Sequence, residues 1–332
     1  MKLHHILFPM LLLAQSALAQ GVDEQLRDDL MKLHENRPSH WKGALNLGTT
    51  FSFTQSQNVI GSQDGVTTQI GGLLDATGEY INGRHTWTST LKALYSESKT
   101  PVLDKFIKAS DSLEISTTYL YRFMQVPWMG PYARLRLATQ MQPGYIVKAS
   151  GYTLARQQAD GTVINDTYAG QVEAQVTGAF DPLLLNEDVG LFANPTESDA
   201  VTVKLKIGLG TQQLLSSWGY ALVDDPKTDV VEVKFLRQAV QVGGNAEAAI
   251  TGKISDDFHW KARAAFFYPF YTNIDRTPTG IDALNSEFSA GISYKLAKWV
   301  SIDYLFGAKR VPLVSTEWQI QNGAVLTAGF TL

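Results

Sequence analysis

The side chains that most often carry covalent or metal chemistry are scarce in this chain. Its 332 residues include six histidines and no cysteine. Four of the histidines lie within residues 1–40, and His85 and His259 each adjoin a predicted short turn. A hydrolase needs a nucleophile held beside a base, and the spacing of these residues indicates no such set. We therefore predict that the protein is not an enzyme and has no cofactor.

Acidic residues cluster twice along the chain, and each cluster is a candidate metal site. Asp181, Glu187 and Asp188 are close in sequence, and three further aspartates lie within residues 224–229. Carboxylate oxygens suit calcium, but the spacing matches no defined calcium-binding loop. Because runs of charge usually form a solvated surface, we predict that no metal is bound.

A set of basic residues is a better indication of function, because many of its members alternate along the chain with apolar neighbours. The set comprises Arg122, Arg134, Arg136, Lys204, Lys206, Lys253, Lys261 and Arg263. If these residues share one face of a sheet, they form a basic wall, and ladders of arginine and lysine guide anions in anion-selective pores. The alternative is structural pairing with acids that fill the same space, as is common inside barrels. The available partners are Glu79, Glu114, Glu173 and Glu247.

The basic wall needs strands to position it, and much of the sequence alternates with a period of two. From Trp41 to Gln55, one set of alternate positions is mainly apolar or aromatic and the other is mainly small or polar. The same pattern predicts twelve strands, many longer than the roughly 5–6 residues usual in soluble proteins and suited to the roughly 9–11 of a tilted membrane span. They cover residues 41–55, 66–80, 86–95, 113–123, 133–141, 172–180, 201–209, 240–254, 260–268, 288–296, 300–306 and 318–332.

The predicted connections alternate between short and long, as they do in outer-membrane proteins. Short turns are predicted at residues 82–83 and 256–257, and long polar connections at residues 143–166 and 216–237. The two long connections could contain hairpins, so fourteen strands is the alternative count. Residues 182–200 depart from the alternation, because this connection should be short but is long and contains three consecutive leucines.

Aromatic residues gather at both ends of the predicted strands. A soluble β-sandwich would carry aromatics in mid-strand as often as at the ends, whereas a membrane barrel has an aromatic girdle at each interface. We therefore predict an all-β fold: a closed antiparallel transmembrane β-barrel of about 12 strands, with short periplasmic turns and long extracellular loops. Closure pairs every backbone group, which a lipid environment demands.

The start of the chain indicates export. Residues 1–19 combine a basic start, a short apolar run and a terminal A-L-A motif, which is typical of a secretory signal peptide. Residues 20–40 carry leucines at helical spacing and predict a short amphipathic periplasmic helix. Residues 41–332 then form the predicted barrel. The predicted location is the cell outer membrane of a Gram-negative bacterium.

The last strand carries a resemblance to known proteins. The chain ends in AVLTAGFTL, in which Leu326, Ala328, Phe330 and Leu332 share one register. This pattern resembles the C-terminal assembly signal of Gram-negative outer-membrane β-barrel proteins, which usually ends in an aromatic residue where this chain has leucine. The resemblance implies that the barrel assembly machinery and outer-membrane lipid are partners of the chain.

Three further stretches resemble an uncharacterised outer-membrane barrel family, a domain of unknown function. They are Trp41 to Gln55, Lys99-Thr100-Pro101 with Lys108 and Asp111, and Gly130-Pro131-Tyr132. Because that family has no assigned activity, the resemblance implies fold and location alone.

Function is predicted from the lumen. The first hypothesis is a small pore or passive transporter that passes a small polar or anionic solute along the basic wall, with a preference for anions as one alternative. The alternative is a structural or surface-interaction barrel with a filled lumen, whose long loops bind a partner. With a net charge of −4 and both signs mixed, the chain has no concentrated basic surface of the kind that binds nucleic acid.

The segment before the barrel yields a first prediction. If the amphipathic helix of residues 20–40 plugs the lumen, deletion of residues 21–40 raises the single-channel conductance in a planar bilayer, because the obstruction is gone. An unchanged conductance would remove the plug from consideration.

Overall fold

The computed structural model describes residues 40–56, 65–198, 200–223, 228, 230–274, 280–297, 300–312 and 315–331. The predicted signal peptide, the helical segment 20–40 apart from His40, and Leu332 lie outside these ranges. Strands dominate the described chain, which confirms the all-β prediction. Among the described residues, no helix has the length and apolar character that crossing a membrane would require.

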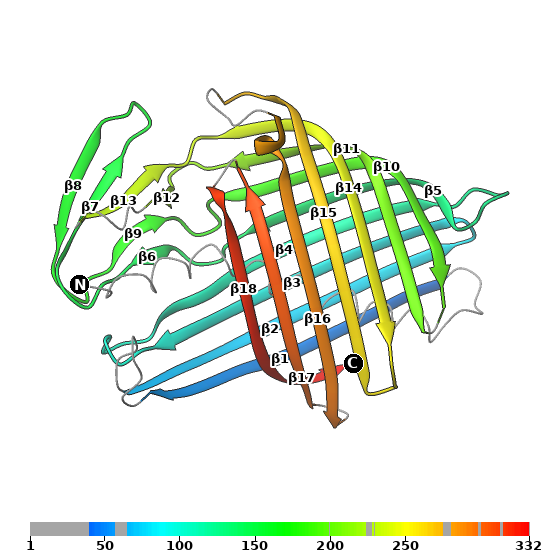
Figure 1. The fold of residues 1–332 in the computed structure, drawn as a ribbon, viewed down its shortest axis with the longest axis horizontal. Coiled ribbons are helices and arrows are strands. Elements are labelled where there is room, and N and C mark those ends of the chain that lie inside the picture. The colour runs from blue at the N-terminus through cyan, green and yellow to red at the C-terminus, as the bar shows by residue number, and fades with distance from the viewer. Residues whose placement is uncertain are drawn as a thin grey trace.

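Most strands belong to one large antiparallel sheet (Figure 1). Its members are β1 (His40–Ser56), β2 (Gly65–Asn82), β3 (His85–Lys99), β4 (Ile107–Tyr121), β5 (Met129–Thr139), β10 (Leu183–Glu197), β11 (Val201–Leu215), β14 (Ala239–Lys253), β15 (Phe258–Thr272), β16 (Asn285–Ala297), β17 (Val300–Val311) and β18 (Ser315–Thr331). The order is β1-β18-β17-β16-β15-β14-β11-β10-β5-β4-β3-β2. Because β1 pairs with β2 on one side and with β18 on the other, the sheet closes into a barrel.

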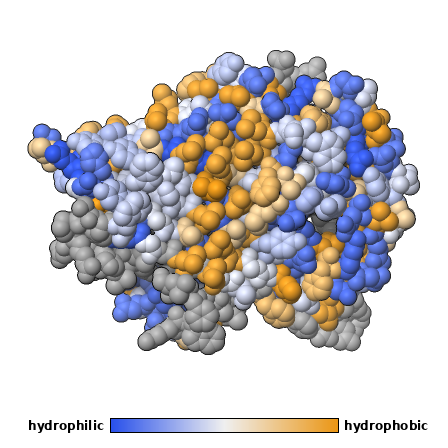
Figure 2. All heavy atoms as spheres, turned by 180° about the vertical axis from the view of Figure 1, so that it is seen from behind, coloured by the Kyte–Doolittle hydropathy of each residue, from blue (hydrophilic) through white to orange (hydrophobic). Residues whose placement is uncertain are grey.

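The two faces of the barrel wall have opposite polarity. In β3, Thr86, Thr88 and Thr90 point inward and are buried, whereas Trp87 between them is 52% exposed on the outer face. Exposed apolar side chains such as Ile207 recur on the outer face of the other strands. They gather in a broad patch over the wall (Figure 2). This distribution is the reverse of that in a soluble domain, where apolar side chains line the core.

The connections differ between the two ends of the barrel. At one end, here called the turn side, β2 and β3 are joined at residues 83–84, with Gly83 in the left-handed region at φ 56°. At the other end, the loop side, residues 140–182 join β5 to β10 and residues 216–238 join β11 to β14.

One predicted strand is wrong. The strand predicted at residues 172–180 is not in the barrel, and β10 at Leu183–Glu197 takes its place between β5 and β11. The long connection predicted at residues 182–200 is therefore mostly a strand. Part of this stretch does form a strand, β9 (Ala174–Thr177). Its apolar side chains alternate because they pack into a separate core and not because they face outward from the barrel.

That core belongs to a folded unit on the loop side, made of the described parts of residues 140–182 and 216–238 and here called the loop unit. It contains β6 (Gly144–Ile146), β7 (Tyr152–Gln157), β8 (Val163–Tyr168), β9, β12 (Tyr220–Leu222) and β13 (Val230–Phe235). One sheet has the order β12-β13-β7-β8 and the other pairs β6 with β9. The long connections thus contain strands, as the fourteen-strand alternative supposed, but these strands do not enter the barrel.

The loop unit has its own hydrophobic core. Leu154, Val231 and Val233 are almost completely buried, and Tyr152 and Tyr220 close the cluster. Because residues from both long connections contribute to this core, neither connection can form it alone.

This core yields a second prediction. Leu154→Ala removes a fully buried side chain and is expected to destabilise the loop unit by about 2–5 kcal/mol. Limited proteolysis should then cleave the loop unit while the barrel stays intact. The matched control is Val163→Ala in the same unit, because Val163 is exposed. Equal protease resistance in the Leu154 variant and the wild type would contradict an independent core.

Candidate functional site

Charged side chains meet in the lumen at the middle of the barrel wall. Arg134 of β5 lies opposite Asp188 of β10 in the strand register, and its Nε is 2.9 Å from Asp188 Oδ2. The Nη1 atom of the same arginine is 2.9 Å from Glu247 Oε2 of β14. Both carboxylates are buried, so the charge-assisted hydrogen bonds replace the lost hydration.

Glu247 is the centre of this group. Besides Arg134, it accepts hydrogen bonds from Lys206 Nζ of β11 at 2.9 Å and from Arg263 Nη2 of β15 at 3.0 Å. Arg263 also lies 3.1 Å from Glu287 of β16. Six adjacent strands, from β16 to β5 in the sheet order, therefore contribute to one network, here called the charged layer. Its members are Arg134, Asp188, Lys206, Glu247, Arg263 and Glu287.

The charged layer crosses part of the lumen instead of following the wall. Arg134 and Glu247 stand on β5 and β14, which are separated in the sheet by β10 and β11. The same two strands are joined a second time, because the Tyr132 hydroxyl donates to Asn245 Oδ1 at 3.0 Å. Side chains therefore meet face to face in this corner of the barrel.

A glycine makes room for the layer. Asn245 Nδ2 donates to Asp188 Oδ1 at 2.7 Å, directly over Gly210 of β11. A Cβ atom at Gly210 would lie 2.4 Å from Asp188 Oδ1 and 2.8 Å from the backbone oxygen of Glu187. A side chain at this position is therefore incompatible with the observed contacts.

The remaining lumen is also polar. Arg136 of β5 pairs with Glu114 of β4, with Nε 3.0 Å from Oε1. On the wall formed by β1 to β3, Lys42 lies 3.9 Å from Glu79. Charged residues of both signs thus line the interior on several strands.

The structure brings together half of the predicted basic wall. Arg134, Arg136, Lys206 and Arg263 are paired with carboxylates in the lumen. Lys204 and Lys261 occupy inward positions of β11 and β15. The other two lie at turns: Arg122 Nη1 donates to the Pro127 carbonyl oxygen at 3.0 Å, and Lys253 is 3.2 Å from Asp256.

The predicted acidic partners divide in the same way. Glu114 and Glu247 join basic-wall residues, whereas Glu79 pairs with Lys42. Glu173 lies outside the barrel, where Lys105 Nζ contacts it at 2.7 Å.

Two partners in the charged layer, Asp188 and Glu287, were missed. The strand predicted for β16 began at residue 288, one residue after Glu287, and residues 182–200 were predicted as a connection. A strand assignment for residues 183–197 would have placed Asp188 on the inward face. It would also have placed Glu187 on the opposite face, where it accepts a hydrogen bond from Thr211 at 3.0 Å. In the described part of the chain, no group of three or more histidine, cysteine or acidic side chains could hold a metal ion.

His85 and His259, the two histidines that the sequence placed beside short turns, are close to the turn side. His85 Nδ1 lies 2.5 Å from the Tyr119 hydroxyl on the outer face. His259 is buried and faces Ser293, which in turn faces Asp303 across the next strand pair. Ser293 therefore lies between His259 and Asp303. In a catalytic triad the histidine lies between the serine and the carboxylate, so this arrangement has a different order.

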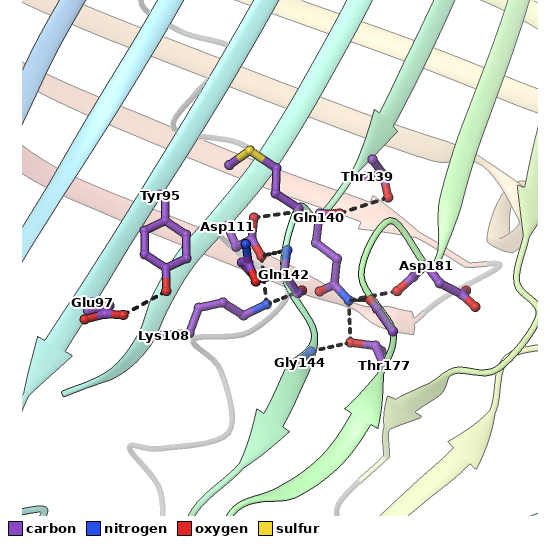
Figure 3. Close-up of polar contacts among 12 residues, drawn as sticks. Tyr95, Glu97, Lys108, Asp111, Thr139, Gln140, Gln142, Gly144, Thr177 and Asp181 are labelled. Carbon is purple, nitrogen blue, oxygen red and sulfur yellow. Dashed lines mark hydrogen bonds and ion pairs between the residues drawn. The ribbon is translucent and has the colours of Figure 1, made fainter. Parts of the chain in front are cut away.

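A polar joint attaches the loop unit to the barrel rim (Figure 3). Asp111 of β4 accepts hydrogen bonds from the backbone N–H groups of Met141 and Gln142, each at 2.7 Å. Gln140 Nε2 donates to the carbonyl oxygens of Gly178 and Asp181 at 2.7 and 2.8 Å. The start and end of one long connection are thereby held together.

Asp181 joins this connection to the second one. Its Oδ2 accepts hydrogen bonds from Ser217 N at 3.0 Å, Ser217 Oγ at 2.7 Å and Trp218 N at 2.9 Å. Burial of Asp181 favours the neutral acid, but these hydrogen bonds outweigh it, so the pKa of Asp181 lies below its ordinary value of 3.8.

The residues of the predicted C-terminal signal lie in β18, apart from Leu332. Phe330 is paired with Leu47, Ala328 with Thr49, and Leu326 with Ile302. The signal strand therefore closes the ring against β1.

No protein-family model matches the sequence, and no curated protein matches it. Among solved structures, the chain is similar to the translocator domain of the autotransporter NalP from Neisseria meningitidis, with 12% identity, a TM-score of 0.38, and coverage of 96% of this chain and 98% of that chain. It is also similar to the outer membrane channel DcaP of Acinetobacter baumannii, with 7% identity, a TM-score of 0.33, and coverage of 90% and 99%. Membership of an uncharacterised barrel family stays a prediction.

The joint yields a third prediction, on pH. A carboxyl group whose pKa is lowered by folding stabilises the folded state above its unfolded pKa, near 3.8, and this effect is lost as the pH falls through the folded pKa. The protease resistance of the loop unit should therefore decline at pH values below about 3.8. In Asp181→Asn, which costs about 1.5–3 kcal/mol of charge-assisted hydrogen bonding, resistance should be lower at neutral pH and change less with acid. An acid response identical in both proteins would contradict this role for Asp181.

Proposed function

We propose that the chain is a transmembrane β-barrel of a Gram-negative outer membrane and that it acts as a small pore whose passage is limited by the charged layer. The membrane placement is supported by the polarity of the wall, with apolar side chains outside and polar ones inside. The closed order of twelve strands supports it further, because closure leaves no unpaired sheet edge in lipid.

Aromatic side chains support a membrane between the two barrel ends. On the turn side, Trp41 and Tyr80 are in ring contact at 5.0 Å, and Trp41 and Trp87 are exposed. On the loop side, Tyr268 and Tyr271 of β15 are exposed. Tryptophan and tyrosine favour the interfaces of a bilayer. The turn side would face the periplasm and the loop unit the exterior, as in other outer-membrane proteins.

The observation that carries the pore proposal is the contact of Arg134 with Glu247 across one corner of the lumen. Buried ion pairs seldom stabilise a protein more than apolar side chains of similar volume would. A barrel that only needed a filled interior would have no need of this layer. We infer that the layer sets a narrow, polar constriction in a path for small polar solutes.

Anion preference is the finer part of this proposal. In the charged layer, Arg134, Lys206 and Arg263 balance Asp188, Glu247 and Glu287, so its six charges sum to zero. Selectivity for anions would therefore depend on how the basic wall is exposed when the constriction widens.

The second candidate is a surface-interaction barrel. It is supported by the loop unit, which has its own hydrophobic core and a polar joint to the barrel. A segment that only connected two strands would need neither. In that case the charged layer fills the lumen, and the exterior surface carries the function.

These two candidates lead to a fourth prediction. Glu247→Gln removes the carboxylate shared by Arg134, Lys206 and Arg263, and breaking such a buried group costs about 3–5 kcal/mol locally. Mutual repulsion of the three cations should widen the constriction. Single-channel recordings in a planar bilayer with a salt gradient should show higher conductance than the wild type and a shift toward anions.

The matched control is Glu187→Gln, which removes a carboxylate from the outer face at mid-strand and should leave conductance unchanged. Wild-type and Glu247 variants that both insert as folded barrels without conductance would contradict the pore and favour the surface-interaction barrel.

A further inference from the structure

One lysine in the lumen has no bonding partner among the described residues. In β17, Tyr304 and Phe306 are exposed on the outer face and Asp303 is buried, so the odd-numbered positions face inward. Lys309 therefore points into the lumen, where it is half-buried. It forms no ion pair and no hydrogen bond with any described residue. The strand predicted here ended at residue 306, so Lys309 was not included in the basic wall.

The two carboxylates that attract Lys309 are already bound to arginines. Glu287 lies directly opposite Lys309 in the register of β16 and β17, but it contacts Arg263 Nη1 at 3.1 Å. Glu114 is held by two nitrogens of Arg136, with Nε 3.0 Å from Oε1 and Nη2 donating to Oε2 at 3.0 Å. Each of these carboxylates therefore neutralises an arginine, and the Lys309 ammonium stays an unpaired positive charge among the described side chains.

Lys309 also lies where opposite walls of the barrel approach one another. In the ring order, five strands separate β17 from β5 on either side. The Lys309 ammonium is nevertheless close enough to Arg136 of β5 and to Arg263 of β15 for electrostatic repulsion. Three cations from three strands therefore converge in the lumen, and the contacts with Glu114 and Glu287 balance only two of them.

The wall next to Lys309 carries small residues. Gly307 is the next inward position of β17, and it lies opposite Ser289 of β16. Gly291 follows Ser289 on the same face of β16. These positions add no large side chain to the volume beside the Lys309 ammonium, and Ser289 adds a hydroxyl group that can donate or accept a hydrogen bond.

The chemistry around Lys309 indicates the class of ligand. An ammonium group has three N–H donors and no acceptor, and its strongest hydrogen bonds are made to negatively charged oxygen atoms. One negative charge matches the one unpaired cation, whereas a divalent anion would be repelled more strongly by Glu114 and Glu287. A carboxylate has a single charge and two acceptor oxygens, so it fits both conditions.

We infer that Lys309 is the anion-binding residue of the lumen and that its ligand is a small monovalent carboxylate. This inference rests on the proposed pore, because it names the solute class that passes the charged layer. The carboxylate pairs with Lys309 on its way through, as anions do with lysine and arginine in anion-selective pores. Binding at Lys309 can also be measured without conduction.

The test uses the purified full chain in nonionic detergent micelles, with trifluoroacetate as the probe. Fluorine NMR detects weak binding of this monovalent carboxylate as line broadening. The wild type should broaden the signal saturably, and excess acetate should reverse the broadening. Lys309→Gln removes the charge but keeps a polar side chain, and it should weaken binding about tenfold or more.

The matched control is Lys295→Gln, which removes a lysine from the exposed turn-side end of β16 and should leave binding unchanged. Acetamide resembles acetate but has no charge, so it should not reverse the broadening. Sulfate at equal ionic strength should reverse it less than acetate does, because of its second charge.

Thermal unfolding separates ligand binding from a structural role. No described carboxylate depends on Lys309 for an ion pair, so Lys309→Gln should unfold at the same Tm as the wild type. A lowered Tm together with unchanged trifluoroacetate binding would make Lys309 a structural counter-charge and would overturn the inference.

Planar-bilayer recordings in a gradient of sodium acetate separate this inference from the pore itself. If the wild type conducts, Lys309→Gln should lower the permeability ratio of acetate to sodium. A wild type that binds trifluoroacetate through Lys309 but does not conduct would contradict the pore and support the site.

Three results would overturn the site: a wild type without saturable binding, equal binding by the Lys309 variant, or equal reversal by acetate and acetamide. Displacement by chloride or sulfate as effective as that by acetate would overturn the assignment of a monovalent carboxylate.

Discussion

The fold depends on pairing every backbone group of the large sheet. In the lipid environment proposed for this chain, an unpaired N–H or C=O group costs several kcal/mol, so only a sheet that closes on itself is tolerated. The closing contact joins the first and last strands, from Asn46 opposite Thr331 to Thr50 opposite Thr327. Once the ring is closed, each residue points either into the lumen or away from it. The apolar outer surface and the polar interior follow from that alternation.

A polar interior creates a second constraint, because charges removed from bulk water must be paired. The charged layer meets this requirement with contacts of 2.9–3.1 Å around Glu247 and Arg263. Four of the strands that carry it, β5, β10, β11 and β14, are also the strands whose loop-side ends continue into the loop unit. The strands that carry most of the charged layer therefore also carry the loop unit, and the joint at Asp111, Gln140 and Asp181 attaches that unit to the barrel rim.

The chain uses the same two-residue alternation for two opposite purposes. In the barrel, the apolar row faces outward, as Ile207 and Leu209 do. In the loop unit, the apolar row faces inward, where Leu154 and Val231 form the core of a small two-sheet structure. Alternation alone shows that a strand has two environments, but it does not show which row is covered by protein. Residues 172–180 were predicted as a barrel strand for this reason.

The sequence by itself determined the all-β class, the positions of most barrel strands and the inward side of Arg134, Arg136, Lys206 and Arg263. These features depend on local alternation, which each strand carries independently of its neighbours. Only the tertiary structure decided which acid meets which base. The Arg134–Glu247 contact joins residues 113 positions apart on strands separated by two others, and it depends on the register of each intervening pair. The loop unit was likewise beyond sequence reasoning, since its core forms only when two connections from different parts of the chain fold together.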